Sequence, residues 1–368
     1  MKAYIAGGCH EHGRNSFLLE GNEYSLLVDC GTMQGSETPN PYLSKEQISK
    51  MRYIFLTHSH KDHVGSLDWL YEEGFGGTVY LAKETYEQLP SKPRDYVLLD
   101  ILERNTVKIE ENLEVTYGRS GHCAGSLWYM MNFDEKKIVF SGDYCEDSQA
   151  YICDVLRDVQ VDMAFVDCAY GTKVGTAAEN KAKLDERINE CFESGKHLLL
   201  PVPPNGRGLD LLKMVSDSKY ASSIVVDTVF KKRIEATKAC KHWLKDEHLL
   251  QDVAVLTECN FDSPTAILVA DGQMKSEKNQ VIAQKVLAQD GKIIFTGHTD
   301  LNSFASHLVK EEQAQLIIYS VHQNLEEALR LCEKNEWKQV ILTHCSKELP
   351  VEDESKFLKL KSKDEVYF

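Results

Sequence analysis

The feature that most constrains this chain is a run of six residues, His58-Ser59-His60-Lys61-Asp62-His63. Histidine makes up only 13 of the 368 residues, so three histidines and an aspartate in this template would arise by chance in roughly one such chain per thousand. Imidazole and carboxylate groups together suit zinc, iron or manganese. Four ligands within six residues cannot all bind one ion comfortably, so the run predicts two neighbouring metal ions that share a bridging group.

A second feature recurs along the chain: a short apolar run ends in a polar residue capable of chemistry. Each run is typical of a buried strand. Layered α/β folds place their sites at strand ends, because rigid strands hold the loop residues in position. Amphipathic helices are predicted over 178–193, 209–215 and 326–334. The apolar runs, each given with the polar residue that comes after it, are 53–56 before His58, 138–140 before Asp143, 163–166 before Asp167, 316–319 before His322, and 340–342 before His344.

Three residues far from the histidine run are candidates for the remaining ligands. His122 is surrounded by small residues, which permit close approach of the backbone. Asp143 follows a Ser-Gly pair, and His344 follows the last apolar run. Each of them alone is more often an ordinary loop residue. Their joint occurrence after the histidine run makes all three ligand candidates.

Composition narrows the functional classes. The formal net charge of −15 excludes attraction of nucleic acid over the whole surface. A polyanionic substrate would need metal ions and a local basic patch. No apolar run approaches the length of a bilayer, and residues 1–8 lack the apolar core of a secretory signal. The eleven cysteines include no Cys-x-x-Cys pair, which favours free thiols in a reducing cytoplasm.

On these residues the chain resembles the metallo-β-lactamase superfamily, which implies an α/β fold, the αββα sandwich. Asp29-Cys30-Gly31 is similar to its first motif, the histidine run to its second, Gly121-His122 to its third, and Gly142-Asp143 to its fourth. By that match Asp29 is a supporting carboxylate and Asp143 bridges two metals. One metal is held by His58, His60 and His122, and the other by Asp62, His63 and His344.

The second half resembles the β-CASP branch of that superfamily, which includes ribonuclease J and the 3′-end cleavage subunit of the polyadenylation machinery. The matching segments are motif A at 166–171, a strand, proline and Gly-Arg turn over 195–208, motif B at 320–322 and motif C at 343–345. Their order implies an inserted β-CASP-like α/β domain over 173–315, between lactamase parts 1–172 and 316–368. The histidine at motif C, His344, resembles the RNA-processing members and favours RNA as the substrate.

Several positions depart from the branch's pattern. Motif A reads Asp-Cys-Ala-Tyr-Gly in place of Glu-Ser-Thr-Tyr-Gly, and Gly297-His298-Thr299-Asp300 replaces a familiar Gly-Tyr-Gln segment. Motif B lacks the usual following Ala and Asp, and the sequence stops soon after motif C, without the C-terminal domain of ribonuclease J. These departures bear on the substrate and the cleavage mode, and not on the fold or the metal ligands.

The resemblance also implies a mechanism. Two divalent ions, zinc first with manganese or iron as alternatives, would hold a bridging hydroxide that attacks a phosphodiester. The candidate catalytic residues are Asp62, Asp167 and His322. Asp167 would orient His322, which protonates the leaving oxygen; alternatively, Asp167 caps a strand and His322 begins a helix. Arg207 is the candidate substrate-binding residue, because a Gly-rich turn before a helix suits a phosphate, with a simple tight turn as the alternative.

Three functions compete on these grounds. A ribonuclease of single-stranded RNA is expected, because an inserted domain over the metals would make a long groove. The alternative is a small-molecule hydrolase of a thioester, lactone or phosphodiester, which the acidic charge favours. A non-catalytic binding module is disfavoured, because no ligand is lost. The expected partners are RNA and a second copy of the chain, with no membrane. The Lys231–Arg233 run, His10 and His12 are interpreted as surface residues; the alternatives are that the basic run contacts a polynucleotide backbone and that the loop of His10 and His12 borders the cleft of this fold.

Overall fold

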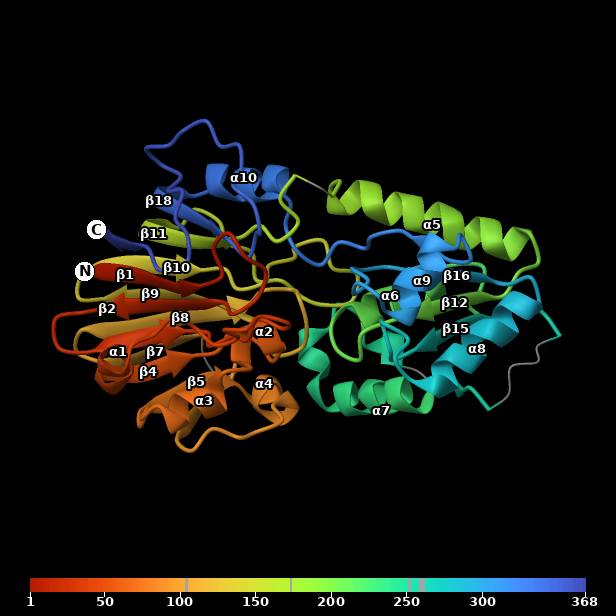
Figure 1. The fold of residues 1–368 in the computed structure, drawn as a ribbon, viewed down its shortest axis with the longest axis horizontal. Coiled ribbons are helices and arrows are strands. Elements are labelled where there is room, and N and C mark those ends of the chain that lie inside the picture. Colours follow the sequence, from red (N-terminus) through yellow and green to blue (C-terminus); the bar gives the residue numbers. More distant parts are fainter. Residues whose placement is uncertain (103–104, 173, 251–252, 258–261) are drawn as a thin grey trace. The chain divides into compact units, whose positions relative to one another are not determined.

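The computed structural model describes residues 1–102, 105–172, 174–250, 253–257 and 262–368 (Figure 1). These residues divide into two compact units. The first unit comprises Met1–Glu146, Cys153–Val174 and His322–Phe368. The second unit comprises Asp147–Ile152 and Gly175–Val321, so it is inserted into the first along the chain. None of the described helices is long and apolar enough to cross a membrane.

One sheet of the first unit has seven strands, in the order β19-β1-β2-β3-β4-β5-β6. Strand β2 is antiparallel to both β1 and β3, and β3 is parallel to β4. The carboxyl ends of β1, β3 and β4 therefore lie at the same edge. The strands are β1 Lys2–Gly7, β2 Ser16–Glu20, β3 Ser25–Val28, β4 Met51–Phe55, β5 Thr78–Ala82, β6 Tyr96–Leu99 and β19 Glu365–Tyr367.

The other sheet of the first unit has six strands, in the order β18-β11-β10-β9-β8-β7. Strands β10, β11 and β18 are parallel, while β9 is antiparallel to both β8 and β10. Four strands, β8, β10, β11 and β18, therefore end at one edge, and each is ended or followed by a residue predicted to bind metal or to act in catalysis. The strands are β7 Thr106–Glu110, β8 Leu113–Arg119, β9 Leu127–Phe133, β10 Lys136–Phe140, β11 Gln160–Asp167 and β18 Glu336–Thr343.

Aromatic side chains fill the space between these two sheets. The ring centroid of Phe17 on β2 lies 6.1 Å from Phe140 and 5.0 Å from Phe165 of the opposite sheet. Phe55 on β4 lies 5.6 Å from Tyr129 on β9. All five rings are buried, and removal of each from water contributes roughly 1.5–3 kcal/mol. The two sheets therefore pack face to face around one aromatic core.

Helices cover the outer faces of both sheets. Ile54 points toward α1 and α3, while the next residue, Phe55, points toward the opposite sheet, as strand alternation requires. Helix α10 packs Ala328 and Leu331 against Val340 of the second sheet. The predicted αββα sandwich is confirmed. Its helices are α1 Lys45–Lys50, α2 Lys61–Val64, α3 Leu67–Glu72, α4 Lys83–Gln88 and α10 Leu325–Glu333.

The second unit is built on one parallel sheet, in the order β14-β13-β15-β12-β16-β17. Its strands are β12 Leu198–Pro201, β13 Ile224–Val226, β14 Ala254–Val255, β15 Ala266–Val269, β16 Lys292–Phe295 and β17 Gln315–Leu316. Leu199, Ile267 and Phe295 form its core with side chains of α8 and α9. The helices are α5 Ala177–Glu193, α6 Arg207–Ser216, α7 Thr228–Thr237, α8 Glu277–Ala288 and α9 Phe304–Lys310, with 3₁₀ helices Lys238–Trp243 and Glu247–Leu250.

One predicted element is wrong. The apolar run 316–319 does not form a buried strand, because only Gln315–Leu316 pair, as the edge strand β17, and Leu316 is 44% exposed. Tyr319 turns inward instead, and its hydroxyl donates to Asp210 at 3.3 Å. The run is therefore a connector held by a buried polar contact. The three predicted helices are present as α5, α6 and α10.

Candidate metal centre

The histidine run begins just beyond β4 and opens the short helix α2. Its start is held by Asp29, which follows β3 with a left-handed φ of 59°, a conformation that aspartate tolerates. The Asp29 carboxylate accepts hydrogen bonds from the Thr57 backbone N–H and from the Thr57 hydroxyl, both at 2.8 Å. These bonds join the ends of two neighbouring strands directly before the first predicted ligand, His58.

Hydrogen bonds also decide which ring nitrogen of His58 and His63 faces the site. His63 Nδ1 donates to Asp29 Oδ2 at 2.7 Å. Thr57 Oγ1 gives its own hydrogen to Asp29, so it accepts from His58 Nδ1 at 3.1 Å. The Nε2 atoms of both rings are then the atoms nearest Asp143. A carboxylate or hydroxyl behind a ligating imidazole fixes its orientation in this way, so Asp29 supports the ligands from behind.

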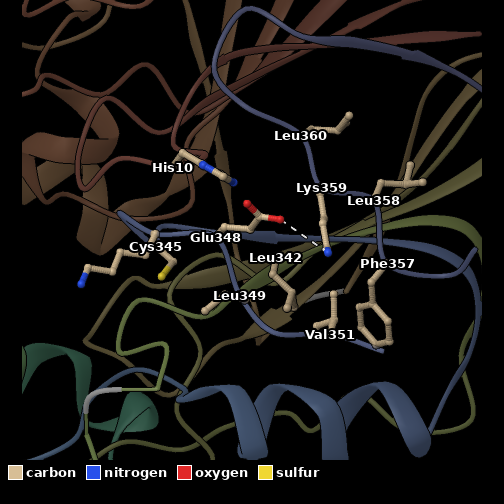
Figure 2. Close-up of a pocket in the computed structure, with 11 residues that line it drawn as sticks. His10, Leu342, Cys345, Glu348, Leu349, Val351, Phe357, Leu358, Lys359 and Leu360 are labelled. Carbon is tan, nitrogen blue, oxygen red and sulfur yellow. Dashed lines mark ion pairs between the residues drawn. The ribbon is translucent and has the colours of Figure 1, made fainter. Parts of the chain in front are cut away.

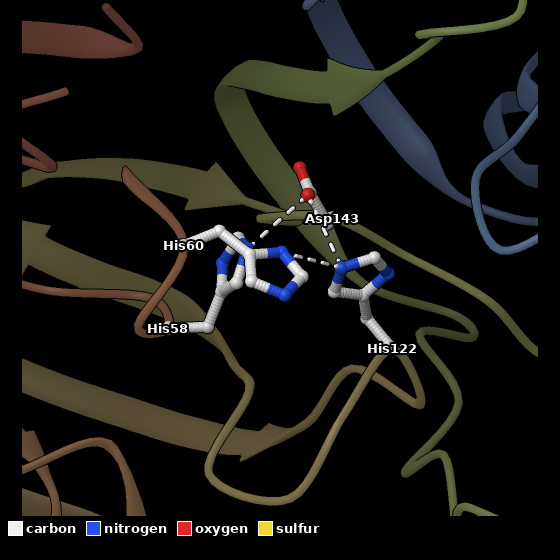
Figure 3. Close-up of side chains that lie close together, drawn as sticks. All are labelled: His58, His60, His122 and Asp143. Carbon is white, nitrogen blue, oxygen red and sulfur yellow. Dashed lines mark hydrogen bonds and ion pairs between the residues drawn. The ribbon is translucent and has the colours of Figure 1, made fainter. Parts of the chain in front are cut away.

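Four predicted ligands, His58, His60, His122 and Asp143, form a first group (Figure 3). Each offers an atom, and these atoms all lie within 4.8 Å of one another. Asp143 Oδ2 lies 3.3 Å from His58 Nε2 and 3.5 Å from His122 Nε2. Gly121 permits this approach, because its φ is 80° and an added Cβ would lie 2.1 Å from a backbone oxygen. The four residues can therefore surround one cation.

Asp62, His63 and His344 form a second group beside the first. Asp62 Oδ2 lies 3.1 Å from His344 Nε2 and 3.6 Å from His63 Nε2. Asp143 Oδ1 lies 3.2 Å from His63 Nε2 and 3.1 Å from His344 Nδ1. The two oxygens of Asp143 are thus divided, one facing each group. The structure brings together all seven predicted ligands, from loops spread across most of the chain.

The donors of both groups fit divalent metal ions. His58 Nε2 is buried and has no hydrogen-bond partner among the described residues, although burial of an unsatisfied polar atom is costly. A bound cation would satisfy this nitrogen. Nitrogen and oxygen donors at this density suit zinc, with manganese or iron as alternatives. The residues present therefore fit the predicted metals, while the number and identity of the ions stay predictions.

Burial and neighbouring charges separate the histidines into two classes. Burial lowers the pKa of His60 to about 3 and lowers the pKa of His122 well below its ordinary value. Burial opposes protonation of His344 as well, but the carboxylates of Asp143 and Asp62 outweigh it and raise the pKa of His344 to about 10. The same balance raises the pKa of His63. In the metal-free chain, His63 and His344 therefore hold protons at the atoms that would bind a cation.

Gln88, at the end of α4, joins the two loops of the first group. Its side-chain oxygen accepts from Ser59 Oγ at 2.6 Å, and its amide donates to the Ala124 carbonyl at 3.0 Å. Ser59 lies between His58 and His60, and Ala124 follows His122 by two residues. Gln88 was not predicted, because no motif or spacing relates it to the ligands. Only the packing of α4 against these loops identifies it.

Asp167 and His322 form a pair at the edge of the two groups. His322 Nδ1 lies 3.2 Å from Asp167 Oδ2, and the His322 ring lies edge-on to His344 with centroids 5.2 Å apart. Asp167 is buried and accepts hydrogen bonds from the backbone N–H groups of Tyr144 and Ala169, each at 3.0 Å. These bonds fix the carboxylate, and the carboxylate in turn orients the half-buried imidazole. The predicted pair is therefore formed in space.

Arg207, the predicted substrate-binding residue, lies in the second unit, whereas two residues not predicted to act at the site lie beside the ligands. Arg207 begins α6 in the second unit, and its guanidinium lies so close to Gly297 that a Cβ there would be 2.1 Å from Nη2. His12 was interpreted as a surface residue and is exposed, but its ring lies 5.8 Å from that of His344. Asn15 was not predicted, and its Nδ2 lies 3.1 Å from His63 Nε2. Both come from the loop between β1 and β2.

Comparison with known proteins supports this architecture. Residues 11–146 match the profile of the Metallo-beta-lactamase superfamily. The chain is 24% identical over 260 residues to the cleavage and polyadenylation specificity factor subunit 3-II of Arabidopsis thaliana, a match to 61% of this chain and 42% of that protein. Residues 11–146 are thus a metallo-β-lactamase domain, and the chain is similar to RNA-processing proteins of the β-CASP branch.

Other relatives of this chain show the same range of similarity. It is 21% identical over 373 residues to the endoribonuclease YSH1 of Candida albicans, with 84% of this chain and 43% of that protein covered. It is 24% identical over 251 residues to the transcription termination factor FttA of Methanosarcina mazei, with 59% and 39% covered. The matches thus span about two fifths of the length of these relatives.

A solved structure shows that the fold extends over the whole chain. A protein of unknown function from Enterococcus faecalis matches 99% of this chain and 99% of its own, with a TM-score of 0.65 and 11% sequence identity. At this identity the likeness concerns the fold alone. It shows that a chain of similar extent adopts the same arrangement of elements.

Metal content is the first prediction. The protein purified without chelator should contain about two divalent ions per chain by elemental analysis, because two donor groups share Asp143. His344→Ala should retain about one ion, since the first group keeps all its donors. His298→Ala, which removes an exposed histidine of the second unit, is the matched control and should retain two. Fewer than one ion in the unaltered chain, after Zn²⁺ or Mn²⁺ is supplied, would refute the two-metal assignment.

Proton release on metal binding is the second prediction. His344 has a pKa of about 10 in the metal-free chain, so at pH 7 it holds a proton that a cation must displace. Zn²⁺ binding should therefore release protons, and metal affinity should weaken as the pH falls. Calorimetric titration in two buffers of different ionisation enthalpy counts the protons. The count should decline as the pH approaches 10, because the proton then leaves before the metal arrives; a count near zero at pH 7 would contradict this.

Proposed function

We propose that this chain is a binuclear metal-dependent hydrolase that cleaves phosphodiester bonds of single-stranded RNA. The observation that carries the proposal is the division of the Asp143 carboxylate between two groups of donors, with the Asp167–His322 pair beside them. Two relatives are named as an endoribonuclease and a cleavage factor subunit. The reaction class follows from these two kinds of support together.

Two divalent ions, held by His58, His60 and His122 and by Asp62, His63 and His344 with Asp143 between them, would supply a water-derived nucleophile at neutral pH and neutralise charge on the phosphate. The chain's own residues position these ligands. Asp62 and Asp143 fix the position of the His344 ring through their contacts with its two nitrogens. Asp29 keeps the His63 ring in the orientation that presents Nε2. Asp62 is therefore proposed to serve catalysis as a ligand.

His322 is the proposed general acid. Its Nδ1 faces Asp167 Oδ2 at 3.2 Å, so Nε2 is the atom from which a proton can pass to a leaving oxygen. Asp167 is itself fixed by two backbone N–H donors and therefore holds the tautomer and orientation of the ring. Protonation of the leaving oxygen by a positioned side chain is worth about 10²–10⁴ in rate.

Arg207, at the first turn of α6, is the proposed phosphate contact in the second unit.

A small-molecule hydrolase is the second candidate function, and the net charge of −15 favours it. A direct assay separates the two. Metal-loaded protein should cleave labelled single-stranded RNA faster than single-stranded DNA of the same sequence, and chelator should abolish the cleavage. Asp143→Ala, prepared in parallel, should be inactive and thus exclude contaminating nuclease. Rapid turnover of a lactone or thioester, with RNA left intact across several metals and salt levels, would establish the second candidate instead.

The proposed acid predicts an asymmetry between substrates. A ribose 3′ alkoxide leaves poorly without a proton, whereas a nitrophenolate leaves readily. His322→Ala should therefore lower the rate of RNA cleavage by about 10²–10⁴, while bis(4-nitrophenyl) phosphate hydrolysis falls far less and metal content stays near two. Asp167→Asn should show the same asymmetry more weakly, because it disturbs only the orientation of His322.

His344→Ala provides the contrast for this pair of variants. It removes a donor of the second group, so it should lower metal content and impair both substrates together. Equal losses on both substrates in His322→Ala, with two metals retained, would show that His322 binds the phosphate or maintains the site and is not the acid. Unimpaired RNA cleavage by His322→Ala would likewise remove it from the mechanism.

A further inference from the structure

His12 is an exposed histidine beside the metal centre that the proposed mechanism does not use. Its ring meets that of His344 edge-on, with centroids 5.8 Å apart and an angle of 72° between the planes. His344 is buried among Asp62 and Asp143, whereas His12 faces solvent. His12 belongs to neither group of clustered donor atoms. It therefore lies at the rim of the second group and not among its ligands.

Strand direction explains why this loop reaches the site. Strands β1 and β3 are both antiparallel to β2, so the loop that leaves β1 emerges at the edge where Asp29 follows β3. Both sides of the loop are tied to segments that carry ligands. The backbone N–H of His344 donates to the Gly8 carbonyl at 2.6 Å, and the backbone N–H of Asn15 donates to the Asp62 carbonyl at 2.8 Å. His12 lies between these two anchors.

Glu11 and Arg14 stiffen the loop around His12. One oxygen of Glu11 accepts from the Gly8 backbone N–H at 3.2 Å and from Ser362 Oγ at 2.7 Å. The same oxygen lies 3.2 Å from Nε of Arg14, whose side chain is only 3% exposed. A side chain on a loop held in this way needs less ordering when a ligand arrives, so more of its contact energy contributes to affinity. The loop is therefore suited to present His12 to a bound molecule.

We infer that His12 is a substrate-binding residue, whose imidazole N–H donates a hydrogen bond to a phosphate oxygen of the nucleotide next to the scissile bond, on the side of the second group. This inference rests on the proposed function. A flanking phosphate is favoured over the scissile one because the scissile phosphate must lie among the buried donors, while His12 stands at the rim. On a chain with a net charge of −15, a polyanion depends on such local donors.

The same loop offers a matched control, His10, two residues earlier. His10 is half-buried and lines a separate small pocket of about 30 Å³ with Cys345, Leu349 and Phe357 (Figure 2). That pocket is bordered by an ion pair between Lys359 and Glu348 at 3.5 Å. His10 and His12 thus share a loop, a residue type and a backbone anchor, but only His12 has its ring beside that of a proposed ligand. Comparison of the two separates substrate contact from loop stability.

The test is steady-state kinetics of His12→Ala, His12→Gln and His10→Ala, all loaded with metal. A hydrogen bond to a charged group is worth about tenfold, so His12→Ala should raise KM for single-stranded RNA about tenfold and change kcat little. His12→Gln should recover part of the loss, because its amide can also donate. Hydrolysis of bis(4-nitrophenyl) phosphate, which has no flanking phosphate, should change far less. His10→Ala should match the unaltered protein on RNA, and metal content should stay near two throughout.

Several outcomes would overturn the inference. Equal losses on RNA and on the aryl ester would place His12 at the scissile phosphate or the metals. A loss of metal in His12→Ala would make it a ligand, and equal effects of His10→Ala and His12→Ala would indicate loop stability alone. Unchanged KM for RNA would remove His12 from the binding site. If the unaltered protein leaves RNA intact, the proposed function fails first and this inference with it; if it cleaves RNA and His12→Ala cleaves equally well, only the inference fails.

Discussion

The carboxylate of Asp143 is the contact on which the rest of the site depends. Its Oδ2 faces His58 and His122, and its Oδ1 faces His63 and His344. Taking one carboxylate and several imidazoles out of water is costly unless every group is paired. A single buried anion between two sets of donors meets that condition for both sets. Removal of Asp143 would therefore separate the groups and leave each without its shared partner.

Much of this arrangement could be predicted from the sequence, because the chemistry is concentrated at strand ends. The histidine run, Asp143 and His344 each follow an apolar run, and the parallel strands β10, β11 and β18 end at one edge of their sheet. The order of the motifs also indicated an inserted domain within a sandwich. Short apolar runs identify strands well when both faces are buried, as for β4, β10 and β11.

The rest could not be predicted, because it depends on packing and not on pattern. Gln88 joins two ligand loops through side-chain hydrogen bonds, and nothing in its neighbourhood along the chain indicates this. His12 was interpreted as a surface residue, although its loop was noted as a possible border of the cleft, and the directions of β1 and β3 place that loop beside His344. The run 316–319 is not a buried strand, because Leu316 is exposed and Tyr319 uses its hydroxyl in a buried contact with Asp210. Local composition does not distinguish a strand from such a connector.

The placement of His344 has a consequence for how the site is assembled during synthesis. His344 contacts Asp143 across 201 residues of sequence, and its backbone N–H bonds to Gly8 near the start of the chain. At a translation rate of about 5–20 residues per second, roughly 10–40 s separate the emergence of the two ligands. During that interval the first donor group can form while the second cannot. The second donor group therefore stays incomplete until strand β18 and His344, late in the chain, have been synthesised.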